Sequence, residues 1–490
     1  MLPRFWILTT VLLIFPSCIL STNPGLKARV TQKALDYARK IGVGMLQQKL
    51  QHMTFPNMGD KVKIKHFGHI RYKIWNLHIY KFGLPQSSVR FSAGQGIQLS
   101  ITNGYIGVKG KWKVKKRFIK LGGSIDVSVS RVSISETIGM SRDSRGSPSL
   151  RSLSCTSSVG HVSVSFHGIK RLIYKLFQKL LDKRIRSALN RQICPKVSSA
   201  VNGLNNDLKT MKLLININNF AEVDYSLVNQ IQITNKSMEL DFKGEFYRVG
   251  HHKEPPFKPP PISLPHESNS MLYLGISDFL ANSAGFVYHE AGILQKSITD
   301  DMIPSSSFIR LNTKSFSTII PGLNKLYPNM NMTMKLYSTR PPVLKATTNN
   351  LTVEAFGNID VFAILPNRSL ASLFVLNLDA GVSAQVAIVG MKLTGSIKLN
   401  QLKLSLVNSR VGPVPVSGLQ LIMKIAISAA VLPKVNERLA NGVPLPSVKT
   451  LKFINPKVMV RQNILVIATD LQYIKSSRYT EQKNQACQLL

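Results

Sequence analysis

Residues 106–129 alternate between apolar and polar side chains, and the alternation changes phase half-way along. The apolar side chains occupy even positions at first and odd positions afterwards: Ile106, Val108, Trp112 and Val114, then Ile119, Leu121, Ile125, Val127 and Val129. A turn has this effect on a period-2 pattern. The segment therefore predicts two antiparallel strands whose hairpin tip holds Lys115, Lys116 and Arg117. On the polar face near the same end we expect Lys111, Lys113 and Lys120.

The charge of the chain is high and uneven. The 490 residues include 63 Lys and Arg against 24 Asp and Glu, a net charge of +39, and 44% are hydrophobic. That apolar content excludes a disordered basic tail protein. Residues 61–120 contain 14 Lys and Arg and no acidic residue. A solvated face normally mixes both signs, because like charges repel. The segment therefore favours a surface that binds an anionic partner.

The N-terminus indicates secretion. An apolar stretch at residues 5–20 follows Arg4 and contains Pro-Ser-Cys near its end, as in a signal peptide covering residues 1–21. A buried N-terminal helix is the alternative. Glycosylation motifs occur only after residue 234, at Asn235, Asn331, Asn350 and Asn367. No apolar run reaches 18 residues, so a membrane-spanning helix is not expected.

Three cysteines remain after signal removal: Cys155, Cys194 and Cys487. An oxidising compartment favours one disulfide and one leftover thiol. Cys487 lies in a polar C-terminal tail, residues 474–490, so we expect the Cys155–Cys194 bond. The mature chain has no clustered histidines and is a poor candidate for a metal site.

A proline-rich stretch at residues 251–270 predicts an extended connector between two domains, residues 22–250 and 271–473. Both halves have a helix–strands–helix order, which suggests a duplication. The periodicity predicts helices at Leu26–Phe55, Gly168–Cys194, Asn282–Lys296 and Val416–Leu439, the last kinked or ended early by Pro433. Short strands are expected between them, for example at Val382–Lys398 and Gln401–Val407, with an earlier hairpin turning at 66–69.

Catalytic motifs are missing. The sequence has no phosphate-binding Walker loop, no Gly-x-Ser-x-Gly and no His-Glu-x-x-His. Its acidic residues form no evident pair. We therefore expect a protein that is not an enzyme.

Several segments resemble the family of bactericidal permeability-increasing protein and lipopolysaccharide-binding protein. They are the mature start at residues 23–37, and residues 63–66, 110–120, 243–247, 273–278, 288–292, 301–304 and 365–373. The resemblance covers residues 23–473. It implies an elongated α+β boomerang, in which two antiparallel β-barrels packed with long amphipathic helices are joined by a central β-sheet.

The resemblance also implies ligands. The cationic tip of the N-terminal domain would bind lipopolysaccharide through its lipid A, and each domain would hold a phosphatidylcholine-like phospholipid in an apolar pocket, with no other cofactor. The family's tip positions correspond to Lys63, Lys65, Lys111, Lys113, Lys115, Lys116, Arg117 and Lys120. The family disulfide corresponds to Cys155 and Cys194. Where the bactericidal protein has a lysine after the glycine of the first turn, this chain has His69, so that contact would depend on pH.

These implications describe a secreted, monomeric, antimicrobial protein of innate immunity that acts at the outer membrane of Gram-negative bacteria, with granule storage before release as a further expectation. The alternatives are a protein that delivers lipopolysaccharide to a host receptor and a plasma phospholipid-transfer protein. Specific nucleic-acid binding is disfavoured by the signal peptide, although nonspecific attraction to phosphate remains open.

Overall fold

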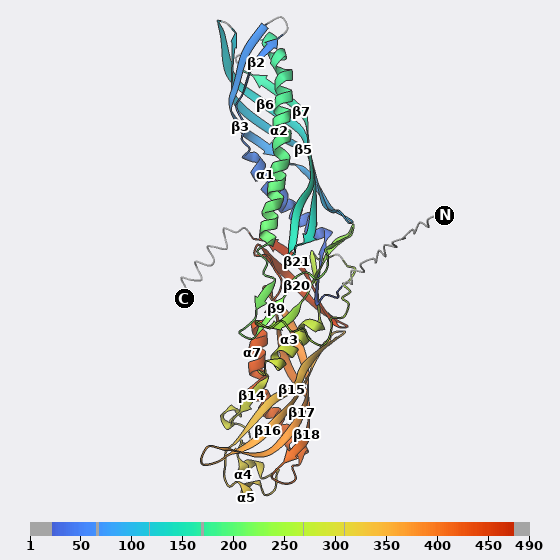
Figure 1. Ribbon diagram of the computed structural model, residues 1–490, viewed down its shortest axis with the longest axis vertical. Coiled ribbons are helices and arrows are strands. Elements are labelled where there is room, and N and C mark those ends of the chain that lie inside the picture. Colours follow the sequence, from blue (N-terminus) through green and yellow to red (C-terminus); the bar gives the residue numbers. More distant parts are fainter. Residues whose placement is uncertain are drawn as a thin grey trace, which may run out of the picture.

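The computed structural model describes residues 22–64, 68–116, 118–167, 171–267, 269–307 and 309–474. The molecule is elongated, with a curled antiparallel sheet and helices at each end and a third six-stranded sheet between them (Figure 1). The predicted α+β fold class is confirmed. The expected signal peptide, most of the C-terminal tail, Lys65 and Arg117 lie outside the described residues.

The N-terminal sheet has the strand order β2-β3-β5-β6-β7, and β4 pairs with β5. Its strands are β2 (Met58–Ile64), β3 (Gly68–Gly83), β4 (Gln86–Ser92), β5 (Gly96–Lys116), β6 (Ile119–Arg142) and β7 (Pro148–Phe166). Their inward side chains pack against helices α1 (Gln32–Gln51) and α2 (Arg171–Leu208). The phase change predicted for residues 106–129 is present as the β5–β6 hairpin.

The first predicted helix begins later than expected. Helix α1 starts at Gln32, and Leu26–Thr31 forms strand β1 in the central sheet. Leu26 and Ala28 are buried in this strand. The apolar pattern of a segment as short as this one is compatible with a helix or with a strand. Hydrogen bonds to the neighbouring strands β11 (Ser237–Phe242) and β13 (Leu272–Ser277) make it a strand.

The second predicted helix is longer than expected. Helix α2 does not end at Cys194 but continues through Pro195 to Leu208. A proline inside a helix costs about 3 kcal/mol. The apolar side chains of Ile193 and Val197 are buried on either side of it, and their packing offsets that cost.

A disulfide attaches α2 to the sheet. Cys155 of β7 is bonded to Cys194 of α2, and their Cα atoms are 5.7 Å apart. The structure therefore contains the predicted pairing. The same helix also packs on the sheet through three buried side chains, Leu181, Ile185 and Leu189.

Glu136 makes this half sensitive to pH. Its side chain lies opposite Cys155 in β6 and is 1% exposed. Burial raises the pKa of this carboxyl above its ordinary value of 4.5, and the Ser152 hydroxyl partly offsets the rise. The unfolded chain therefore ionises first as the pH rises, so stability declines above about pH 4.5 until the folded-state pKa has been passed.

We expect Glu136→Gln to raise the free energy of unfolding at pH 7 by about 1–3 kcal/mol, because the neutral amide avoids the desolvation penalty of a buried carboxylate charge. The gain should vanish near pH 4, where the carboxyl is protonated in both states. Urea unfolding at a series of pH values measures it, with the exposed Glu267→Gln as the control. A constant difference across that range would contradict the assignment.

The central sheet has the order β10-β11-β1-β13-β21-β20 and mixes strands from both halves of the chain. Its strands are β10 (Gln232–Ile233), β11 (Ser237–Phe242), β1, β13 (Leu272–Ser277), β21 (Ile464–Tyr473) and β20 (Leu451–Arg461). A three-stranded sheet adjoins it, formed by β8 (Leu214–Asn216), β9 (Ala221–Asp224) and β12 (Glu245–Arg248). The proline-rich connector packs on the central sheet through Ile262 and Leu264.

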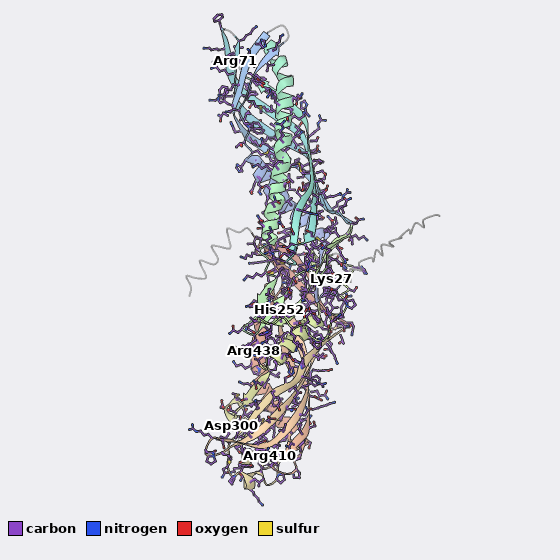
Figure 2. The ribbon with its side chains drawn as sticks, viewed as in Figure 1. Lys27, Arg71, His252, Asp300, Arg410 and Arg438 are labelled. Atoms are coloured by element: carbon purple, nitrogen blue, oxygen red, sulfur yellow. A yellow bond between two sulfur atoms is a disulfide. The ribbon has the colours of Figure 1, made fainter. Side chains whose placement is uncertain are left out.

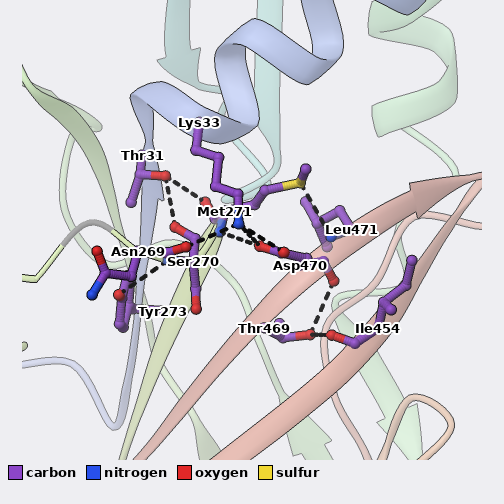
Figure 3. A network of polar contacts seen from close by, with 10 residues as sticks. All are labelled: Thr31, Lys33, Asn269, Ser270, Met271, Tyr273, Ile454, Thr469, Asp470 and Leu471. Carbon is purple, nitrogen blue, oxygen red and sulfur yellow. Dashed lines mark hydrogen bonds and ion pairs between the residues drawn. The ribbon is translucent and has the colours of Figure 1, made fainter.

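A polar network ties the start of α1 to the connector and to β21 (Figure 3). Lys33 Nζ lies 2.8 Å from an Asp470 carboxylate oxygen and donates to the Asn269 carbonyl at 2.9 Å. The Met271 N–H donates to the same carboxylate at 2.9 Å. Partial burial raises the pKa of Asp470, but the hydrogen bonds from Lys33 and Met271 outweigh it and hold the pKa below its ordinary value. Residues near both ends of the chain are thereby joined.

The C-terminal sheet has the order β14-β15-β16-β17-β18-β19. Its strands are β14 (Gln295–Ile298), β15 (Met332–Thr347), β16 (Asn350–Ile364), β17 (Leu370–Val389), β18 (Lys392–Ser409) and β19 (Val443–Pro444). The short helices η1 (Asp300–Met302), α4 (Thr313–Phe316) and α5 (Leu323–Leu326) lie in this half.

Two predictions for this half were wrong in detail. The helix expected at Asn282–Lys296 is α3 (Asp278–Glu290), which starts at a Ser277 side-chain cap and is followed by β14. The strand expected at Val382–Lys398 spans two long strands, because the chain turns at Gly390 with a positive φ of 62°. A glycine supplies that backbone conformation without steric cost.

The late apolar helix is interrupted near Pro433. It consists of α6 (Val416–Ala426), a π-helical segment η2 (Ile427–Val431) and α7 (Leu432–Asn441). Proline cannot donate a backbone hydrogen bond, and the change of helix type precedes it directly. By length and composition this stretch is apolar enough to cross a membrane. Here Leu419, Met423 and Ala426 are buried in the C-terminal core.

Candidate functional site

The β5–β6 hairpin places the predicted basic residues at one end of the molecule. Lys116 pairs with Ile119, so only residues 117 and 118 connect the strands. Trp112 and Val114 are buried, whereas the alternate residues are exposed: Lys111, Lys113, Lys115 and Lys120. Lys63 is also exposed, on β2, opposite His69 of β3. Lys116, the last residue of β5, is half-buried. The structure thus places the predicted residues that it describes at one end of the N-terminal sheet, and their role in binding stays a prediction.

Strand register adds cations that the sequence prediction left out of the site. Lys61 lies opposite Arg71, Arg71 opposite Lys115, and Lys115 opposite Lys120. We call these four exposed residues, one from each of β2, β3, β5 and β6, the cationic row. Figure 2 shows Arg71 near the end of the N-terminal half. A second pair, Lys73 and Lys113, lies beside the row.

The row is electrostatically costly in the absence of a ligand. Neighbouring strands are about 4.8 Å apart, and like charges directly opposite each other destabilise a sheet. Among the described residues, no ion pair involves a member of the row. The carboxylates near this end have other partners: Asp60 contacts Arg184 at 2.9 Å, and Asp126 contacts His167 at 2.8 Å. The arrangement is suited to several negative charges arriving together.

An open groove of about 450 Å³ lies on the same part of the sheet. Its lining combines aromatic, aliphatic and basic side chains with two glycines: Trp75, Lys111, Trp112, Lys113, Lys120, Leu121, Gly122, Gly123 and Ser124. A Cβ atom on Gly123 would overlap the His167 carbonyl oxygen, so the groove needs glycine there. Trp75 is held by Lys73, whose Nζ is 5.7 Å from the ring centroid. The groove could accommodate a ring or chain that carries negative charge.

The other predicted sites are the glycosylation asparagines and the two apolar lipid pockets. The asparagines of all four glycosylation motifs are exposed, and their occupancy stays a prediction. The apolar groove between Ile303, Leu311 and Ile422 in the C-terminal half measures only about 10 Å³. That volume is below what an acyl chain requires, so the two-pocket expectation also stays a prediction. The described residues contain no cluster of three or more potential metal ligands.

Comparison with known proteins identifies the fold family. The N-terminal domain model of the LBP / BPI / CETP family matches residues 34–208, and its C-terminal domain model matches residues 215–473. The chain belongs to this family. The resemblance predicted from short motifs is therefore confirmed over almost the whole described chain.

Individual relatives cover nearly the full length. A bactericidal permeability-increasing protein of Sebastes schlegelii is 41% identical over 455 residues, which are 93% of this chain and 96% of the relative. The human lipopolysaccharide-binding protein is 37% identical over 470 residues, 96% of this chain and 98% of the relative. A crystal structure of lipopolysaccharide-binding protein superimposes with a TM-score of 0.65 at 32% identity, covering 93% of this chain and 100% of that one.

Proposed function

We propose that this family member is a secreted, monomeric, non-enzymatic protein of innate immunity that binds lipopolysaccharide through the cationic row and the adjoining groove. The observation that supports the proposal most strongly is the alignment of four exposed cations on four neighbouring strands. Lipid A presents phosphates on sugar rings, which suits basic side chains around Trp75 and Leu121. The name of one relative, the human lipopolysaccharide-binding protein, supports this ligand, and the name of the other, a bactericidal permeability-increasing protein, supports an action on bacteria.

Selectivity would come from the headgroup. Acyl chains gain about 0.8 kcal/mol per CH₂ on leaving water, but a lipid that leaves a bilayer or micelle brings chains that are already dry. The apolar contribution then nearly cancels, and phospholipid held in apolar pockets adds little discrimination. Each Lys or Arg near an anionic surface contributes about 1 kcal/mol before screening. Six such residues favour anionic bacterial lipid by orders of magnitude.

The triple variant Lys111→Ala, Lys115→Ala and Lys116→Ala tests the proposal. We expect lipopolysaccharide binding to weaken by about 30- to 100-fold, because three surface cations are lost. Co-purified phosphatidylcholine, measured by mass spectrometry, should not change. The matched control replaces the exposed Lys398, Lys452 and Lys457 of the C-terminal half by alanine. Equal binding by the tip variant and the control would end the proposal.

Within lipopolysaccharide binding, we favour a bactericidal and endotoxin-neutralising role at the outer membrane. The high charge supports it, since dense cations displace the divalent ions that bridge lipid phosphates. The second candidate is delivery of endotoxin to a host receptor, which the similarity to lipopolysaccharide-binding protein favours. Killing of Gram-negative bacteria and transfer to receptor-bearing cells separate the two roles. Phospholipid transfer would instead show little dependence on salt or headgroup charge.

A further inference from the structure

Phe118 is the outermost apolar side chain of the same tip. It is 98% exposed, whereas the next most exposed large apolar residue among those described, Val389, is 63% exposed. It lies in the two-residue connection of the β5–β6 hairpin, directly before Ile119. A phenyl ring held in water costs free energy that burial would recover. Its position in the most basic part of the protein therefore calls for an explanation.

The distances along the hairpin match the layers of a lipid leaflet. Phe118 lies two residues beyond Lys120 of the cationic row. Two residues of extended chain span at most about 7 Å, so the backbone of Phe118 lies up to roughly 7 Å farther out than the row. The polar zone of a bilayer is about 5–7 Å deep on each side of its hydrocarbon core. When the row lies at the lipid phosphates, Phe118 reaches the acyl boundary.

We propose that the β5–β6 hairpin inserts into an anionic lipid surface, with Phe118 entering the acyl region while the cationic row contacts the phosphates. The inference rests on the proposed function of the tip and adds its mode of attachment. The charge of the surroundings favours lipid as the occupant, because residues 61–120 contain 14 cations and no acid. Unlike a bound lipid's acyl chains, the Phe118 ring leaves water on insertion, so its apolar contribution does not cancel.

The test uses the full chain and vesicles of phosphatidylglycerol and phosphatidylethanolamine. Phe118→Ser should lower vesicle partitioning by about 10- to 100-fold, the range for burial of one phenyl group. Phe118→Trp should partition normally. The tryptophan fluorescence of this variant, after subtraction of the wild-type spectrum, should shift to the blue when vesicles are added. Lipids brominated high in the acyl chain should quench it. The control is Phe220→Ser, which removes a 48% exposed ring next to β9, away from the tip.

The outcomes separate the two proposals. Insertion is wrong if Phe118→Ser partitions like the wild type. It is also wrong if acrylamide quenches the additional tryptophan fluorescence of the Phe118→Trp variant equally with and without vesicles. In that case loss of binding in the triple lysine variant would leave lipopolysaccharide recognition standing. If the lysine variant binds lipopolysaccharide normally while Phe118→Ser loses vesicle partitioning, insertion holds and the proposed lipopolysaccharide recognition is wrong.

Discussion

Replacing Lys61, Arg71, Lys115 and Lys120 together by glutamine is expected to weaken lipopolysaccharide binding by about 100- to 1000-fold and to stabilise the protein at the same time. The loss of binding follows from four surface cations at about 1 kcal/mol each, before screening. The gain in stability follows from three like-charged neighbour pairs across the strands. Each pair costs on the order of 0.2–1 kcal/mol.

Opposite changes in binding and stability would distinguish a binding surface from an ordinary solvated face. Urea unfolding at low ionic strength should show a free energy of unfolding about 1–2 kcal/mol higher for the variant, and added salt should reduce the difference. Lipopolysaccharide titration at the same ionic strengths measures the binding loss. The control replaces four exposed lysines of the C-terminal half by glutamine: Lys398, Lys424, Lys452 and Lys457. A tip variant that matches this control in both measurements would show that the row has no special role.

The hairpin tip could be predicted because the pattern that indicates it lies within one short segment of the sequence. A phase change in a period-2 pattern identifies a hairpin without reference to any other part of the chain, and Lys115 follows directly from it. The row could not be predicted in the same way. Lys61 and Arg71 join Lys115 only through the pairing of β2, β3 and β5, which includes an irregularity between Trp75 and His78. A shift of one residue there would turn every side chain to the other face.

Long-range pairing also explains the errors in the fold. Leu26–Thr31 is a strand because β11 and β13, more than 200 residues away, supply its hydrogen bonds. Helix α2 passes through Pro195 because the sheet buries Ile193 and Val197. In both cases tertiary contacts outweigh local propensity. The exposure of Phe118 could not be predicted for a different reason, because it depends on the length of the connection between β5 and β6.

The Cys155–Cys194 disulfide is expected to stabilise the N-terminal half substantially. The two residues are 39 apart in the sequence. In the chain-entropy model, closing a loop of that size stabilises the folded state by about 4 kcal/mol. The double variant Cys155→Ala and Cys194→Ala should therefore unfold at a much lower urea concentration. Since α2 is still held by Leu181, Ile185 and Leu189, we expect it to remain folded in the absence of denaturant.

Reduction provides an internal check on the disulfide prediction. Dithiothreitol should lower the urea midpoint of the wild type to that of the double variant and should leave the variant unchanged. Cys487→Ser, which alters a cysteine outside this bond, serves as the control and should behave like the wild type with and without the reductant. A reduced wild type that keeps its full stability would mean that packing of α2 on β7 suffices without the bond. The disulfide joins β7 to α2, whereas the cationic row lies on β2, β3, β5 and β6. Loss of the bond should therefore reduce lipopolysaccharide binding only in proportion to the fraction of protein that unfolds.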